Sequence, residues 1–159
     1  MYRDLAPVVV GYLRAHGARE PEDLASEVFV AVVRGLAEFS GDETGFRSWV
    51  FVIAHRRLLD ERRSHSRHPV GPAPAETLDT AVAGVEDEAL ARLSIEDIRA
   101  LLSRLSDDQR DVLLLRIVAG LTVDEVAEVV GKRAGAVKAL QRRGLASLAR
   151  TIAKQAIPL

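Results

Sequence analysis

Residues 120–138 read Gly-Leu-Thr-Val-Asp-Glu-Val-Ala-Glu-Val-Val-Gly-Lys-Arg-Ala-Gly-Ala-Val-Lys, and this stretch predicts two short helices joined by a tight turn. Thr122 and Glu125 have the spacing of a capping box, which begins a helix. Gly131 follows a largely apolar run, at a place where helices commonly end in a left-handed residue. A second helix is expected from about residue 134. Helix, turn and helix at this spacing predict a DNA-binding helix-turn-helix.

The second of these helices is strongly basic. No acid occurs between positions 132 and 150, where six basic residues give a charge of +6. A helix that enters the phosphate-lined major groove needs such an excess of positive charge. The side chains expected to contact DNA are Lys132, Arg133, Lys138, Gln141, Arg142 and Arg143. Those expected to face inward are Val137, Leu140, Leu145 and Leu148.

The charge of the chain is arranged in local blocks, because the 159 residues together carry only −1. Positions 55–68 form a second basic block, with five Arg against two acids. Positions 20–43 and 76–97 each hold seven acids against one Arg. This alternation predicts two nucleic-acid contacts and other surfaces with different partners. The alternative is that the charges belong to ordinary solvated helix faces.

Several classes of function find no support in the sequence. Cysteine is absent, which excludes disulfides, thiol catalysis and Cys-based zinc sites. The four His form no ligand set, and no catalytic grouping or phosphate-binding glycine loop is readable, so we expect no metal, no cofactor and no enzyme. No apolar run approaches the ~20 residues of a membrane span, and no leader is readable. We therefore expect a cytoplasmic protein without membrane insertion.

Proline marks a boundary in the middle of the chain. Residues 68–75, His-Pro-Val-Gly-Pro-Ala-Pro-Ala, cannot continue a helix. We expect a flexible linker over 68–87, between helical blocks at 1–67 and 88–159. The predicted fold class is all-α, with two small helical bundles of which the second contains the helix-turn-helix. The predicted helices cover 3–16, 21–38, 46–64, 89–103, 107–118, 123–130 and 134–153, with a polar loop at 40–45.

The first block carries a second pattern. Residues 23–29 read Asp-Leu-Ala-Ser-Glu-Val-Phe, Phe39 follows, and residues 46–63 read Phe-Arg-Ser-Trp-Val-Phe-Val-Ile-Ala-His-Arg-Arg-Leu-Leu-Asp-Glu-Arg-Arg. This pattern closely resembles the second domain of the bacterial extracytoplasmic function (ECF) sigma factors. Residues 120–138 resemble the fourth domain of the same family. The two resemblances occur in the family's order and together cover about residues 2–151, nearly the whole chain.

The resemblance implies a promoter-recognition subunit of RNA polymerase. In this family the second domain binds the clamp helices of the beta-prime subunit, reads the minus-ten promoter element and opens it, which exposes the non-template strand. The fourth domain reads the minus-thirty-five element as double-stranded DNA and contacts the beta flap. An anti-sigma factor commonly holds the two domains together, so an anti-sigma partner is implied as well.

The resemblance also assigns residues to these roles. Polymerase binding is assigned to Asp23, Leu24, Glu27, Val28 and Phe29. Minus-ten binding is assigned to Phe39, Phe46, Trp49, Arg56, Arg57, Arg62 and Arg63. The loop between the two Phe is expected to capture an extruded base. Minus-thirty-five binding is assigned to the six residues already expected to contact DNA, which are Lys132, Arg133, Lys138, Gln141, Arg142 and Arg143.

The chain departs from the family pattern at three positions. Arg56 stands where Asn is common, Ala136 where Ser or Thr is common, and Gly144 where Ala is common. Two other interpretations remain open. One is a stand-alone helix-turn-helix regulator whose first block dimerises, which the pattern at 23–63 disfavours. The other is a sigma-like interaction protein that does not read DNA, which the acid-free stretch after Lys132 disfavours.

Overall fold

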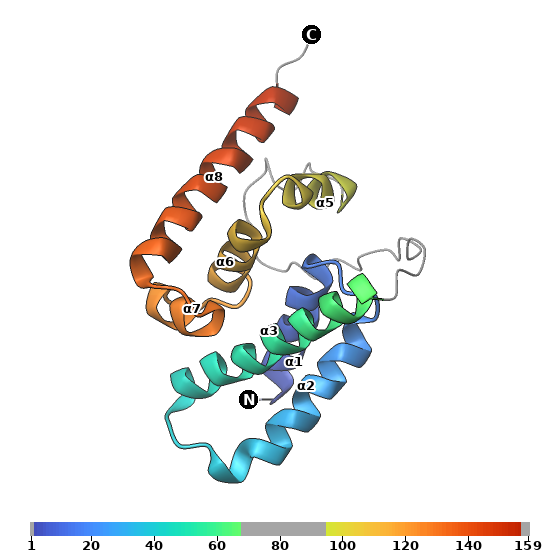
Figure 1. Cartoon of the computed structure of the whole chain (residues 1–159), viewed down its shortest axis with the longest axis vertical. Coiled ribbons are helices and arrows are strands. Elements are labelled where there is room, and N and C mark those ends of the chain that lie inside the picture. Colours follow the sequence, from blue (N-terminus) through green and yellow to red (C-terminus); the bar gives the residue numbers. More distant parts are fainter. Residues whose placement is uncertain (1, 68–94, 157–159) are drawn as a thin grey trace.

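The structure, a computed structural model, describes residues 2–67 and 95–156, and these residues form helices and connecting turns without any strand. The predicted linker at 68–87 lies outside these described residues. The fold is all-α, as predicted. The elements are α1 (Tyr2–Ala15), α2 (Pro21–Gly35), the 3-10 turn η1 (Leu36–Glu38), α3 (Glu43–Arg67), α5 (Ile95–Ser103), α6 (Asp107–Ile117), α7 (Val123–Val130) and α8 (Ala134–Ala156) (Figure 1).

The helix-turn-helix forms from α7 and α8, as the sequence predicts. The Glu125 amide donates to the Thr122 hydroxyl at 3.2 Å, and the Thr122 amide donates to the Glu125 carboxylate at 3.4 Å, which completes the capping box. Gly131 ends α7 at φ +69°, a left-handed conformation that glycine adopts without strain. The amides of Gly131 and Lys132 both donate to the Ala127 carbonyl and close the turn.

The third helix begins at Glu43, before the predicted start at 46. Asp42 explains the difference. Its side chain accepts a hydrogen bond from the Gly45 amide at 2.8 Å, and its carbonyl accepts from the Phe46 amide at 2.9 Å. An Asp that accepts from the first turn caps a helix, so the polar loop predicted at 40–45 is shorter than expected.

The inner face of α8 differs from the prediction at one position. Leu145 is 43% exposed, so the prediction that it faces inward is wrong. Gly144 takes the inward position instead and is buried against α6. A Cβ atom placed on Gly144 would lie only 2.8 Å from Cδ1 of Leu113. The missing side chain therefore lets α8 approach α6 closely.

Replacing Gly144 with Ala is expected to destabilise the protein, although Ala is the better helix former. The helix gains about 1 kcal/mol from the substitution, but Leu113 is itself buried and must move to make room. Overpacking of this kind costs roughly 1–3 kcal/mol, so a net loss of about 1 kcal/mol is expected in urea unfolding. Gly135→Ala on the same helix is the control, because a Cβ there meets nothing within 4 Å. If the Gly144→Ala variant is as stable in urea as the Gly135→Ala variant, this account is contradicted.

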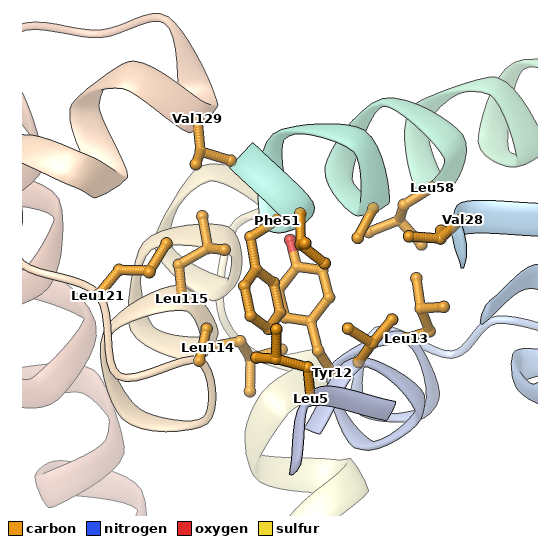
Figure 2. Packing of buried hydrophobic residues seen from close by; sticks show 14 of the residues in the cluster. Leu5, Tyr12, Leu13, Val28, Phe51, Leu58, Leu114, Leu115, Leu121 and Val129 are labelled. Atoms are coloured by element: carbon orange, nitrogen blue, oxygen red, sulfur yellow. The ribbon is translucent and has the colours of Figure 1, made fainter. Parts of the chain in front are cut away.

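The two blocks share one buried core. Phe51 of α3 is fully buried, and its ring lies edge-on to that of Tyr12 at a centroid distance of 5.5 Å. Figure 2 shows Tyr12 of the first block and Leu115 of the second on different sides of this ring. In Figure 1, α7 lies against the N-terminal half of α3. The described parts of the two blocks therefore pack face to face.

Candidate nucleic-acid and partner interfaces

The outer side of α2 combines acidic residues with exposed apolar ones. Asp23 and Glu27 are exposed and lie one turn apart. Val30, Val33 and Leu36 follow along the chain and are 50%, 70% and 51% exposed. We call these five residues the α2 face. Apolar side chains grouped on a surface beside charged ones are typical of a protein-binding site.

The structure changes the set of residues assigned to polymerase binding. Val28 and Phe29 are buried, and Leu24 is half-buried against the core. Val28 and Phe29 thus belong to the hydrophobic core and offer no surface to a partner. Their assignment as polymerase contacts is therefore corrected. Asp23 and Glu27 keep the exposed position that the assignment requires. The exposed Val30, Val33 and Leu36 are the apolar residues that sequence reasoning missed, because helical spacing alone did not separate them from the core.

Three predicted aromatic residues meet at the start of α3. The ring of Phe39 stacks on Trp49 at a centroid distance of 4.9 Å and an angle of 19°. Phe46 lies 5.6 Å from Phe39 and 5.9 Å from Trp49. Gly35 makes room for the indole, because a Cβ there would lie 2.9 Å from it. All three residues are half-buried and lie beside an exposed polar loop, and partly accessible aromatic rings are suited to the stacking of an unpaired base.

The arginines predicted on α3 do not share one environment. Arg56 and Arg63 are exposed and two turns apart, so they lie on one face, while Arg57 is half-buried. Arg62 turns toward the second block. Its Nη2 donates to Nδ1 of His16 at 2.9 Å and lies 3.5 Å from Oδ1 of Asp111. Arg56 and Arg63 are therefore the arginines of this set that face solvent.

Arg47 is a basic residue of α3 that the sequence did not single out. Its Nε donates to the backbone carbonyl of Ala119, in the second block, at 2.7 Å. Arg47 and Arg62 lie near the two ends of α3, and both are held by the second block. The pairing joins residues 72 positions apart in the chain, and no local pattern of the sequence indicates it.

His16 and Asp111 lie buried where the two blocks meet, together with His55 nearby. Arg62 can only donate, so Nδ1 of His16 is the acceptor and the ring proton sits on Nε2, which has no partner among the described residues. Burial, together with the charge of Arg62, lowers the pKa of His16 to about 2. Burial likewise lowers the pKa of His55 to about 4. Burial raises the pKa of the Asp111 carboxyl to about 6, although Arg62 opposes the rise.

The free energy of unfolding is expected to rise with pH between about pH 4 and pH 6. The unfolded chain protonates His16 and His55 in this range, because their ordinary pKa is 6.5, whereas the folded chain keeps them neutral. Asp111 acts in the opposite direction, because its pKa rises on folding from 3.8 to about 6. On balance the unfolded chain binds about one proton more than the folded chain, because two histidines gain a proton on unfolding and one carboxyl loses one. The free energy of unfolding should therefore rise by on the order of 1 kcal/mol per pH unit.

Urea unfolding across this range measures the slope directly. Charged neighbours such as Arg62, Arg110, Asp107 and Asp108 remain in place in a variant with both His16→Gln and His55→Gln. In that variant the free energy of unfolding should no longer rise with pH. It should fall instead, because Asp111 is then the group whose pKa changes on folding. A parent slope near zero, or a slope that the double variant preserves, would contradict the protonation states given above.

The exposed basic residues of the predicted set are Arg133, in the turn before α8, and Lys138, Arg142 and Arg143 on α8. Two members of the set have other partners. The Lys132 ammonium lies 3.4 Å from a carboxylate oxygen of Asp108. The side-chain carbonyl of Gln141 accepts from Nε of Arg116 at 3.2 Å, and Arg116 also donates to the Leu121 carbonyl at 2.6 Å. Arg116, which the sequence did not suggest, thus ties α6 and the turn before α7 to α8.

Lys138 and Arg142 lie on the exposed side of the first turns of α8. They lie one turn apart near the start of the helix. Arg142 stands two positions before the buried Gly144, and therefore on nearly the opposite side of the helix. Both project away from α6 and α7. The geometry is that of a recognition helix with its outer face free.

Within the described residues, no group of His, Asp and Glu side chains could hold a metal ion. None of the described helices is long and apolar enough to span a membrane.

Comparison with known protein families gives two matches along the chain. Residues 1–68 match the family model of Sigma-70 region 2, and residues 95–148 match that of Sigma-70, region 4. The first match contains the α2 face, the aromatic residues and the arginines of α3. The second contains the helix-turn-helix.

Individual proteins resemble the chain over most of its length. The ECF RNA polymerase sigma factor ShbA of Streptomyces griseus is 34% identical over 161 residues, which cover 94% of this chain and 83% of that protein. The ECF RNA polymerase sigma factor SigD of Mycobacterium tuberculosis is 33% identical, over 91% of this chain and 71% of that protein. Among solved structures, the sigma factor RpoE of Bartonella quintana, in complex with the anti-sigma factor NepR, has the same fold with a TM-score of 0.78. It is 18% identical and covers 98% of this chain and 96% of that one.

Proposed function

The chain belongs to the extracytoplasmic function family of RNA polymerase sigma factors, and from this membership we propose how its surfaces bind core polymerase and direct transcription from specific promoters. One observation carries the proposal. Matches to sigma-70 regions 2 and 4 occur in order in one chain, and each contains a helix with exposed basic side chains. Sigma factors are transcription regulators, and we propose that this one performs no catalysis and needs no cofactor.

The α2 face is the proposed docking site for the beta-prime clamp of core polymerase. Its apolar side chains would be buried on docking, and their exposure in the free chain makes that burial favourable. Asp23 and Glu27 would meet basic residues of the clamp and fix the orientation of the complex.

The start of α3 is the proposed minus-ten site. A base extruded from the non-template strand would stack on an accessible ring of the half-buried cluster of Phe39, Phe46 and Trp49. Arg56 and Arg63 would contact the phosphates of the opened element, with Arg57 beside them. Arg62 belongs to this group only when it is released from Asp111.

The outer face of α8 is the proposed reader of the minus-thirty-five element. Lys138 and Arg142 would reach base edges in the major groove, and Arg133 and Arg143 would contact phosphate. Lys132 and Gln141, which have partners on α6, would support this helix rather than read sequence. The beta flap is the proposed polymerase contact of the second block.

An anti-sigma factor is proposed as the regulatory partner. Membership in this family, in which such partners are common, supports the proposal. The cytoplasm is the proposed location, because core polymerase and the promoters that the chain would read are found there.

Transcription in vitro with purified core polymerase tests the proposed function. Addition of the chain should produce transcripts with discrete start sites from genomic promoter fragments, and core polymerase alone should not. Binding to DNA without core polymerase, and no specific transcript with it, would favour a stand-alone regulator. Binding to core polymerase without any transcript would favour an interaction protein.

A further inference from the structure

Five polar side chains meet where the two blocks pack together, and we call them the seam cluster. Arg62 of α3 donates to Nδ1 of His16 at 2.9 Å and lies 3.5 Å from Oδ1 of Asp111, on α6. Nδ1 of His55 lies 3.1 Å from the hydroxyl of Tyr12, whose ring lies edge-on to that of His16. Four members come from the first block and one from the second, so both blocks are needed to form the cluster.

The second block covers this cluster on one side. The carboxylate of Asp111 lies 3.5 Å from His16, whose side chain is completely buried. His55 is also buried, and it lies on the face of α3 that packs on the second block, one turn after Phe51 and two turns before Arg62. Separation of the two blocks would therefore give both imidazoles access to water.

The packed arrangement keeps both imidazoles neutral. Nδ1 of His16 accepts from Arg62, and a ring nitrogen that accepts a hydrogen bond carries no proton. A proton added there would break this bond and place a second buried cation beside the guanidinium. For His55, burial and the charge of Arg62 lower the pKa to about 4. Both rings thus bind a proton more readily when the blocks are apart.

The carboxyl of the cluster acts in the opposite direction but offsets only part of this effect. Burial raises the pKa of Asp111 to about 6, so this group binds a proton in the packed state and releases it on separation. Two imidazoles gain a proton on separation and one carboxyl loses one, which leaves a net uptake of about one proton. The other charged groups that act on the cluster are all on α6, and they are Arg110, Asp107 and Asp108.

We propose that the seam cluster makes the packing of the two blocks sensitive to pH, so that acidification separates them while each block stays folded. Separation exposes His16 and His55, and the protons that they then bind keep them from returning to a buried site beside Arg62. The response begins below the ordinary histidine pKa of 6.5. It is a property of the free chain and does not rest on the proposed function.

Thiol labelling of the free chain measures the separation. The chain has no Cys, so each variant carries a single thiol. Val129→Cys places the thiol where the blocks meet, and Figure 2 shows Val129 beside α3. Val28→Cys places it in the interior of the first block, and Glu128→Cys places it at an exposed position of α7. The rate at position 129 divided by the rate at position 128 gives the separated fraction at each pH, and the rate at position 28 reports complete unfolding.

Between pH 6 and pH 5 the separated fraction is expected to rise about tenfold, which is the effect of one proton. Val28→Cys should react more slowly than Val129→Cys throughout. In the Val129→Cys chain, Asp111→Asn removes the opposing carboxyl, so the rise should steepen to about 50-fold. His16→Gln together with His55→Gln should turn the rise into a fall. Circular dichroism checks the fold, and Asp111→Asn carries the test if the double histidine variant does not fold.

Three results would overturn the inference. The first is a separated fraction that stays constant between pH 6 and pH 5. The second is equal reaction at positions 28 and 129, because the blocks would then come apart only when the whole chain unfolds. The third is an acid response that a folded double histidine variant keeps, or that Asp111→Asn leaves no steeper than in the parent.

Discussion

Replacing Val33 with Asp is expected to lower the affinity of the chain for core RNA polymerase roughly 30-fold, a loss of about 2 kcal/mol. Val33 is 70% exposed, so the substitution should leave the fold intact. In the docked complex it would bury a charge within the apolar part of the α2 face, without a partner. Fluorescence anisotropy of the labelled chain, titrated with core polymerase, measures the change.

The acids of the same face give an independent result. A variant with both Asp23→Lys and Glu27→Lys should also bind more weakly, and the loss should shrink as salt rises, because the interaction is electrostatic. The loss caused by Val33→Asp should depend less on salt. Ala100→Asp, at an exposed position of α5, is the matched control. Parent-like affinity in both folded α2 variants would remove this face from the proposal.

The second large effect is expected on the recognition helix. Arg142→Ala should weaken binding to the minus-thirty-five element by roughly 10- to 100-fold and relax the preference at one base pair, because an arginine on a base edge contributes about 1–3 kcal/mol. Lys138→Ala should produce a different profile, since the two side chains stand one turn apart. Selection from a randomised element, with holoenzyme rather than the free chain, measures both preferences.

Lys154→Ala provides the control for this helix. Lys154 is exposed on α8 but lies far from its start, so its removal should leave sequence preference unchanged. If Arg142→Ala weakens all sites alike, Arg142 contacts phosphate and not a base. If Lys138→Ala and Arg142→Ala both bind and transcribe like the parent, another face reads the promoter.

Local chemistry explains which parts of the fold the sequence predicted well. The capping residue Thr122 and the turn at Gly131 specify helix ends through neighbouring atoms, and the structure contains both. The start of α3 was placed too late, because Asp42 was assigned to a loop when it caps the helix. Short-range signals of this kind are readable once the hydrogen-bond partner is considered.

Long-range packing explains most of what the sequence did not show. Phe51 sits within an apolar run, and nothing local reveals that it packs on the second block. Arg62 belongs to a run of basic residues that is assigned to minus-ten DNA, yet its partner Asp111 is 49 positions away. Val33 lies within the largely apolar run of α2, and only the arrangement of α1, α2 and α3 shows that it is exposed.

The close approach at Gly144 has a consequence for how promoter preference can change over evolution. The depth to which α8 settles on α6 depends on the volumes at positions 113 and 144. With the proposed role of α8, that depth sets the tilt at which this helix meets the major groove. A larger residue at one position and a smaller one at the other would preserve the spacing, so the two should vary together among relatives. Substitutions at these two buried positions could thus change which promoters are recognised, while every side chain proposed to contact DNA stays the same.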